Sequence, residues 1–143
     1  MLVTPIILLA GLIALSGCAG SKRAEQTTDH LVTDETAAGI KIERIHPSAA
    51  GMMLDMRYRI VDLEKAKGAF KHGAQIYLVD QSRGIKLPVP DMAMVGKLMQ
   101  RPDQGDNKKI FWIFFNNPGA MVKPGDKVTL VIDEIRIKDI LVE

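Results

Sequence analysis

The residue types that most often perform chemistry are few in this chain and are not arranged as a catalytic site. None of the serines lies in a Gly-x-Ser-x-Gly turn. The three histidines, His30, His46 and His72, are far apart in the sequence, and there is no His-Glu-x-x-His, phosphate-binding loop or Gly-x-Gly-x-x-Gly motif. The sequence therefore predicts a protein that is not an enzyme and that needs no cofactor.

Methionine is the one abundant residue type that could bind a metal ion. The chain has eight methionines, and four candidate ligands fall into two groups, Met52 with Met56 and Met92 with Met94. Thioether sulfur is a soft ligand that suits Cu(I), but the His-x-Met pair typical of periplasmic copper chaperones is missing. Methionine also fills irregular gaps in protein cores. We therefore expect packing roles for these side chains and keep copper binding as an alternative.

The single cysteine, Cys18, follows an uncharged apolar run. Residues 2–15 have the length of a signal-peptide apolar region and are too few to span a hydrocarbon core of about 30 Å with margin. The run ends in Leu15-Ser16-Gly17-Cys18, which resembles the lipobox of bacterial lipoproteins, Leu-small-small-Cys. The resemblance implies a signal peptide over residues 1–17, cleavage between Gly17 and Cys18, and acylation of Cys18. The alternative is a plain transmembrane or buried helix in which Cys18 is an ordinary thiol.

The lipoprotein resemblance also gives an expected location and expected partners. Two or more acyl chains hold a protein stably to a membrane, so the lipid bilayer is the first expected partner. Ala19 is not acidic, which in the lipoprotein pattern is compatible with export to the outer membrane, facing the periplasm. The near balance of 19 Lys and Arg against 17 Asp and Glu argues against a nucleic-acid partner.

The elements that would position these residues follow from composition and periodicity. Residues 18–39 are polar, rich in small side chains and without apolar periodicity, which predicts a flexible tether, with a short helix possible around residues 29–36. Alternation of apolar and polar residues predicts strands within a domain from Ile40 to Glu143. The expected strands are residues 40–45, 52–61, 75–79, 84–89, 110–115, 127–132 and 134–142.

The strands are joined by segments with turn or helix signals. Asp62 is placed to cap one short helical turn. Residues 91–108 are expected to form a long loop that has room for one helical turn around residues 95–100. About seven short strands with little helix predict an antiparallel immunoglobulin-like β-sandwich. The Cys-Trp-Cys arrangement of antibody domains is absent, so the prediction concerns architecture alone.

The segment Ile110–Phe115 (IFWIFF) is apolar on both faces. Because a sandwich strand meets the core with one face only, the face with Trp112 and Phe114 must be covered by the 91–108 loop, by a partner or by a ligand. Tryptophan is a frequent anchor residue in protein interfaces. Two functions remain open: a non-enzymatic interaction or structural module that docks onto another envelope protein, and a lipoprotein that binds a small ligand or copper.

The first two predicted strands carry a set of basic residues on the face expected to meet solvent. Arg57 and Arg59 alternate with apolar residues, and Lys41 and Arg44 lie on the neighbouring strand. They could form a basic stripe that approaches anionic head groups or peptidoglycan. A solvated strand face with no specific partner is the expected role.

Overall fold

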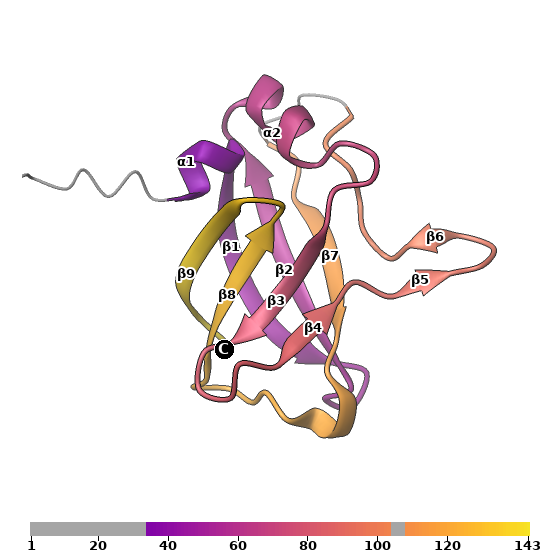
Figure 1. Cartoon of the computed structure of the whole chain (residues 1–143), viewed down its shortest axis with the longest axis vertical. Coiled ribbons are helices and arrows are strands. Elements are labelled where there is room, and N and C mark those ends of the chain that lie inside the picture. Colours follow the sequence, from indigo (N-terminus) through magenta and orange to yellow (C-terminus); the bar gives the residue numbers. More distant parts are fainter. Residues whose placement is uncertain (1–33, 104–107) are drawn as a thin grey trace, which may run out of the picture.

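The computed structural model describes residues 34–103 and 108–143, in which seven strands form two antiparallel sheets packed face to face (Figure 1). The predicted signal peptide and Cys18 lie outside these residues. The first sheet has the order β1-β2-β7, with bounds Ile40–Ser48, Met53–Ile60 and Phe111–Asn116. The second has the order β4-β3-β8-β9, with bounds Lys86–Pro88, Ile76–Asp80, Lys127–Ile132 and Ile135–Leu141. The predicted all-β sandwich is therefore confirmed.

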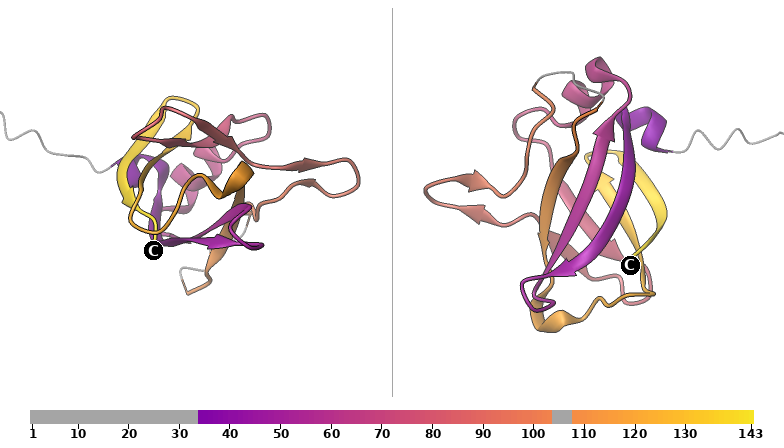
Figure 2. Two further views of the ribbon diagram at one scale, coloured as in Figure 1. Left: turned by 90° about the horizontal axis from the view of Figure 1, so that it is seen from below. Right: turned by 180° about the vertical axis from the view of Figure 1, so that it is seen from behind.

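The chain crosses between the sheets three times, after β2, before β7 and after β7, as in an immunoglobulin-like Greek key (Figure 2). At one edge the two sheets meet, because Ile45 of β1 forms a parallel bridge with Val142, just after β9. The Glu143 N–H donates to the Ile45 carbonyl at 2.8 Å. The C-terminal residues thus connect the two sheets along this edge of the sandwich.

The core lies between the sheets and follows from the alternation in the sequence. The register pairs Leu54 with Phe115, Met56 with Ile113 and Tyr58 with Phe111, so that these side chains point inward together and are buried. The Tyr58 ring stacks on Phe111 and also on Phe70, at centroid distances of 5.5 and 5.4 Å. The Tyr58 hydroxyl donates to the Gln100 carbonyl at 2.7 Å, and burial raises the pKa of this phenol.

Two short helices, α1 (Asp34–Ala38) and α2 (Leu63–Ala69), lie at one end of the sandwich. Asp62 caps α2 as predicted, since its carboxylate accepts from the Lys65 N–H. The end of the predicted tether is part of the fold, because Ala38 is buried and Gly39 lies against α2 with a φ of +67°. No helix of the described chain is long and apolar enough to cross a membrane.

Gly39 is held by contacts that exclude any side chain. A Cβ atom there would lie 2.4 Å from the Asp62 carbonyl oxygen. The Gly39 carbonyl accepts hydrogen bonds from the N–H groups of Val61 and Asp62, at 2.9 and 3.0 Å. This glycine therefore fixes the start of β1 against the first turn of α2.

The segment after β4 differs from the prediction. The helical turn expected around residues 95–100 is wrong: residues 91–97 form a hairpin, β5 (Asp91–Met92) and β6 (Gly96–Lys97), which projects from the body (Figures 1 and 2). Next, the Phe114 N–H donates to the Leu98 carbonyl and the Gln100 N–H donates to the Trp112 carbonyl. Residues 98–100 thus pair with the edge of β7, whose backbone groups need partners that a helix would not supply.

Candidate functional site

The four candidate methionine ligands do not come together. Met56 is fully buried in the core, whereas Met92 and Met94 lie on the projecting hairpin with 51% and 95% of their surface exposed. Met52 is exposed in the turn before β2. The structure therefore contradicts a copper site built from these sulfurs. Among the described residues there is also no group of three His, Cys, Asp or Glu side chains that could hold a metal ion.

Trp112 and Phe114 lie on the outer face of the first sheet, as their alternation with Phe111, Ile113 and Phe115 predicts. Their ring centroids are 5.5 Å apart and the ring planes are inclined by 56°. Residues 98–100 run along the edge of β7 and leave both rings partly exposed. This aromatic pair is the apolar part of the candidate site.

An ionic cluster lies beside the aromatic pair. The register places Asp55 opposite Phe114 and Arg57 opposite Trp112, and on the other side of β2 it places His46 opposite Asp55. Arg57 Nη2 donates to Asp55 Oδ2 at 2.6 Å, and His46 Nε2 lies 3.9 Å from the same oxygen. Asp55 is only 4% exposed, although it belongs to the outer face of the sheet.

Each residue of this cluster has a buried polar atom without a hydrogen-bond partner within the described chain. These atoms are His46 Nδ1, Asp55 Oδ1 and Arg57 Nε. Leaving one such atom unpaired costs about 1–3 kcal/mol, so buried polar groups normally have a partner. We call His46, Asp55, Arg57, Trp112 and Phe114 the aromatic–ionic face. It combines partly exposed rings with buried polar atoms that have no partner in the described chain.

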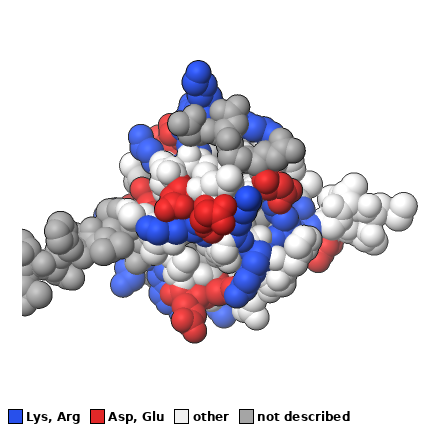
Figure 3. Space-filling model, turned by 90° about the horizontal axis from the view of Figure 1, so that it is seen from above, with Lys and Arg blue, Asp and Glu red and all other residues white. Residues whose placement is uncertain are grey.

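The predicted basic stripe forms in part. Lys41 lies opposite Arg59, and Arg44 lies opposite Arg57. Arg59 forms an ion pair with Glu43 at 3.2 Å, and Arg57 is paired with Asp55. The helical end of the molecule likewise carries acidic and basic side chains next to each other (Figure 3). Neither the first sheet nor this end of the molecule therefore presents a strongly basic binding surface.

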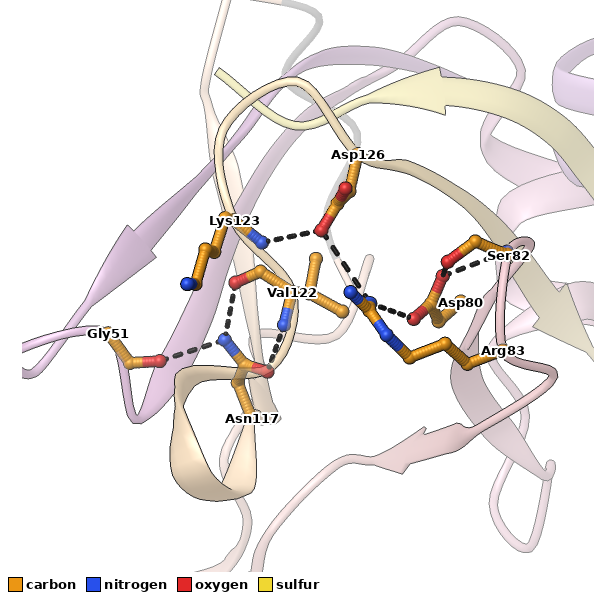
Figure 4. Close-up of polar contacts among 8 residues, drawn as sticks. All are labelled: Gly51, Asp80, Ser82, Arg83, Asn117, Val122, Lys123 and Asp126. Atoms are coloured by element: carbon orange, nitrogen blue, oxygen red, sulfur yellow. Dashed lines mark hydrogen bonds and ion pairs between the residues drawn. The ribbon is translucent and has the colours of Figure 1, made fainter.

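A second set of buried polar residues, drawn in Figure 4, lies at the end of the sandwich away from α1 and α2 (Figure 1). Asp80 is fully buried, and its Oδ1 accepts from the N–H and hydroxyl of Ser82 at 2.9 and 2.8 Å. Its Oδ2 accepts from Arg83 Nη1 at 2.6 Å, and the same nitrogen lies 3.8 Å from Asp126. Burial alone would raise the pKa of Asp80, but the hydrogen bonds from Arg83 and Ser82 outweigh it and lower this pKa below its usual range.

Asn117 completes this second set. It is fully buried, and its Nδ2 donates to the carbonyls of Gly51 and Val122, both at 2.8 Å. Its Oδ1 accepts from the Val122 N–H at 3.0 Å. We call Asp80, Ser82, Arg83, Asn117 and Asp126 the turn network. The Asp80 carboxylate and the Asn117 amide have their hydrogen bonds completed by neighbouring turns. The turn network therefore holds these turns together and is not a candidate binding site.

A hollow of about 770 Å³ lies at the base of the projecting hairpin. Charged side chains of both signs line it, among them Lys97, Arg101 and Asp103. Neither Trp112 nor Phe114 lines this hollow or three further hollows of the described residues. These four hollows therefore give no support to a small-ligand pocket beside Trp112.

Sequence reasoning identified part of the candidate site. Trp112 and Phe114 were predictable because their strand is apolar on both faces, and Arg57 because it alternates with core residues. His46 and Asp55 were missed, since their role depends on the pairing of three strands. A possible signal was an acidic residue in the middle of a strand, between two core positions, which is costly to bury unless it is paired.

The aromatic–ionic face can bind by ring stacking, hydrogen bonding and charge, and its five residues include no paired nucleophile and base. Comparison with known proteins adds no relative to this picture. No family model, curated protein or solved structure matches the chain. The chemistry of the aromatic–ionic face is therefore the main guide to function.

Proposed function

We propose that this chain is a lipid-anchored component of the bacterial cell envelope that docks onto another envelope protein through the aromatic–ionic face, without being an enzyme. The lipobox residues Leu15-Ser16-Gly17-Cys18 support the anchor. Acylated Cys18 would hold the domain at the membrane, with the outer membrane and a periplasmic orientation favoured by Ala19.

One observation carries the docking part of the proposal. A partly exposed Trp112–Phe114 pair adjoins three buried polar atoms that lack partners in the described chain. Tryptophan and arginine are the residue types most enriched at the energetic centres of protein interfaces. A docked protein would cover the rings and could offer a carbonyl or carboxylate oxygen to the Arg57 side chain, which is 31% exposed.

The anchor is tested by fatty-acid labelling in cells. Bacteria that express the full chain are grown with labelled palmitate, and we expect label on the wild-type protein. Cys18→Ser removes the acceptor thiol and should abolish labelling, whereas the matched control Ser21→Ala should retain it. Label on the Cys18→Ser variant, or none on the wild type, would overturn the lipoprotein assignment.

Docking is tested by co-purification. The full chain, tagged after Glu143, is crosslinked in cells, solubilised in detergent and purified. We expect a stoichiometric envelope protein that is lost in the Trp112→Ala variant. The control is Ile140→Ala, which shortens a partly buried apolar residue of β9 on the other sheet. Thermal unfolding of both variants shows that they are folded. A partner retained by Trp112→Ala, or no partner at all, would contradict docking at the aromatic–ionic face.

A further inference from the structure

The hollow of about 770 Å³ at the base of the β5–β6 hairpin is lined by three basic residues, Lys97, Arg101 and Lys109. It lies between the connection from α2 to β3, which contributes His72, and the chain that leaves the hairpin (Figure 1). We call this space the hairpin hollow. Ligand pockets in proteins typically measure about 300–1,000 Å³, so the hairpin hollow has room for a small organic molecule.

One backbone turn holds the charged ends of Lys97 and Arg101. The Ala74 N–H donates to the Lys71 carbonyl at 3.1 Å, which closes the turn. Arg101 Nη1 donates to the carbonyls of Phe70 and Lys71, at 2.5 and 3.1 Å, and Lys97 Nζ donates to the Ala74 carbonyl at 3.1 Å. Because the two ends of such a turn lie within about 7 Å of each other, the two cationic groups are held near one another.

No acidic side chain of the described residues compensates these positive charges. The backbone carbonyls accept hydrogen bonds but carry no net charge. None of the ion pairs within the described residues includes Lys97, Arg101 or Lys109. Lys97 and Arg101 are partly buried, so salt and water screen their charges less than those of exposed side chains. An anion in the hairpin hollow would supply the missing negative charge.

Two carboxylates, Asp91 and Asp103, also line the hairpin hollow. Both residues are exposed, and neither belongs to an ion pair within the described part of the chain. Exposed charges are screened by the solvent, so these carboxylates repel an anion less than the partly buried cations attract it. With three Lys and Arg residues against two Asp residues, the lining keeps a net positive charge.

The hairpin hollow has apolar walls as well. Met99 and Phe111 are buried members of the core, and both line the hollow. Lys109 Nζ lies 5.2 Å from the centroid of the Phe111 ring, so a third cation lies beside an apolar wall. This combination suits an organic anion, in which a charged head group is attached to an apolar body.

We propose that the hairpin hollow binds a small organic anion, with its carboxylate or phosphate group at Lys97 and Arg101. The apolar part of the anion contacts Met99 and Phe111. Within the described residues Arg101 uses only Nη1 for hydrogen bonds, which leaves Nη2 and Nε as donors. A guanidinium group binds carboxylate and phosphate with two parallel hydrogen bonds. No residue of the aromatic–ionic face lines the hairpin hollow, so this site is separate from the proposed docking surface.

NMR titration of the full chain in a neutral detergent tests the proposal. The probes are phenyl phosphate and benzoate, and the uncharged control is benzyl alcohol. We expect saturable changes in the amide signals of His72, Lys97 and Arg101 with at least one of the anions, and the tighter of the two identifies the head group. Changes of equal size with benzyl alcohol, or no saturable change with either anion, would overturn the proposal.

Substitutions assign the binding to the cations. Arg101→Gln should weaken the affinity for the tighter probe tenfold or more, and Lys109→Gln should weaken it by a smaller factor. Because Lys109 is exposed and forms no hydrogen bond within the described residues, its variant keeps the test valid even if Arg101→Gln fails to fold. Lys138→Gln, at an exposed position of β9, is the matched control and should leave the affinity unchanged. An unchanged affinity in Lys109→Gln would contradict the assigned site. Trp112→Ala should bind the probe normally, so this test and the docking test fail independently.

Discussion

Asp55 and Asp80 are both buried carboxylates that are paired with an arginine, yet their surroundings differ. Both oxygens of Asp80 accept hydrogen bonds, from Ser82 and Arg83, which lie two and three residues after it in the chain. Asp55 uses one oxygen for Arg57, and its other oxygen has no hydrogen-bond partner within the described residues. Asp80, whose hydrogen bonds are complete, fixes a turn, whereas Asp55 is buried with one acceptor unused.

The two carboxylates also differ in what is beside them. Asp80 belongs to the turn network, which includes the fully buried Asn117 amide. Asp55 belongs to the aromatic–ionic face, next to two partly exposed rings. We therefore expect substitutions in the turn network to reduce the stability of the free protein, and those in the aromatic–ionic face to have their main effect on binding.

The largest loss of stability is expected for Asn117→Ala. The variant leaves the carbonyls of Gly51 and Val122 and the Val122 N–H without their partner, which should lower the free energy of unfolding by about 3 kcal/mol. Urea unfolding measures the change. Asn116→Ala, at the neighbouring exposed position, is the control and should change stability by no more than about 0.5 kcal/mol. Equal losses in the two variants would refute the structural role of Asn117.

A direct comparison of the carboxylates is the next test. Asp80→Asn replaces a charge-assisted bond to Arg83 with an amide and should cost about 1–2 kcal/mol. Asp55→Asn removes an incompletely paired buried charge, so the loss of its bond to Arg57 is offset by easier burial and the net change should stay within about 0.5 kcal/mol. Urea unfolding of both variants measures which of them loses more free energy of unfolding. A larger loss for Asp55→Asn would reverse the distinction between the two clusters.

The lowered pKa of Asp80 predicts a smaller effect that depends on pH. Because this pKa is lower in the folded state than in the unfolded chain, the unfolded chain binds the proton more readily between the two values. The stabilisation is complete above the unfolded pKa of about 3.9 and is lost as the pH falls through the folded value. Below about pH 4, wild-type stability should therefore fall more steeply than that of Asp80→Asn. Parallel stability profiles of the two proteins would show that Asp80 does not contribute.

The smallest effect on stability is expected for His46→Gln. His46 Nε2 lies 3.9 Å from Asp55, beyond hydrogen-bonding distance, and its side chain is 36% exposed. The free energy of unfolding should change by no more than about 0.5 kcal/mol in the same urea assay. A loss above about 1 kcal/mol would place His46 among the residues that hold the sheet together.

The strands were predictable because one face of each sandwich strand is buried, which gives a period of two in the sequence. This period located β1, β2, β7, β8 and β9 to within a few residues. The β5–β6 hairpin was missed because its strands are two residues long and show no alternation. Residues 98–100 pair with β7, a partner about fifteen positions away in the chain, which no local pattern can reveal.

The candidate site was predictable only where a single strand defines it. The alternation in β7 places Trp112 and Phe114 on one face. The meeting of His46 with Asp55 depends on the register of β1 with β2, and this register shifts between Ile42 and Arg44. Since a shift of one residue exchanges the two faces of a strand, periodicity alone would have placed His46 wrongly.

The contacts of Gly39 determine how the domain responds to mechanical load. A pull on the chain ahead of α1 first loads α1, which packs on β1 and β9 and whose Glu35 accepts from the Ile42 N–H, and it then passes through Gly39 into β1. The ladder between β1 and β2 extends from Ile40 to Ser48. When the load is directed along β1, these bonds are sheared together and do not open one after another. A load of this direction is therefore shared by the whole ladder between β1 and β2.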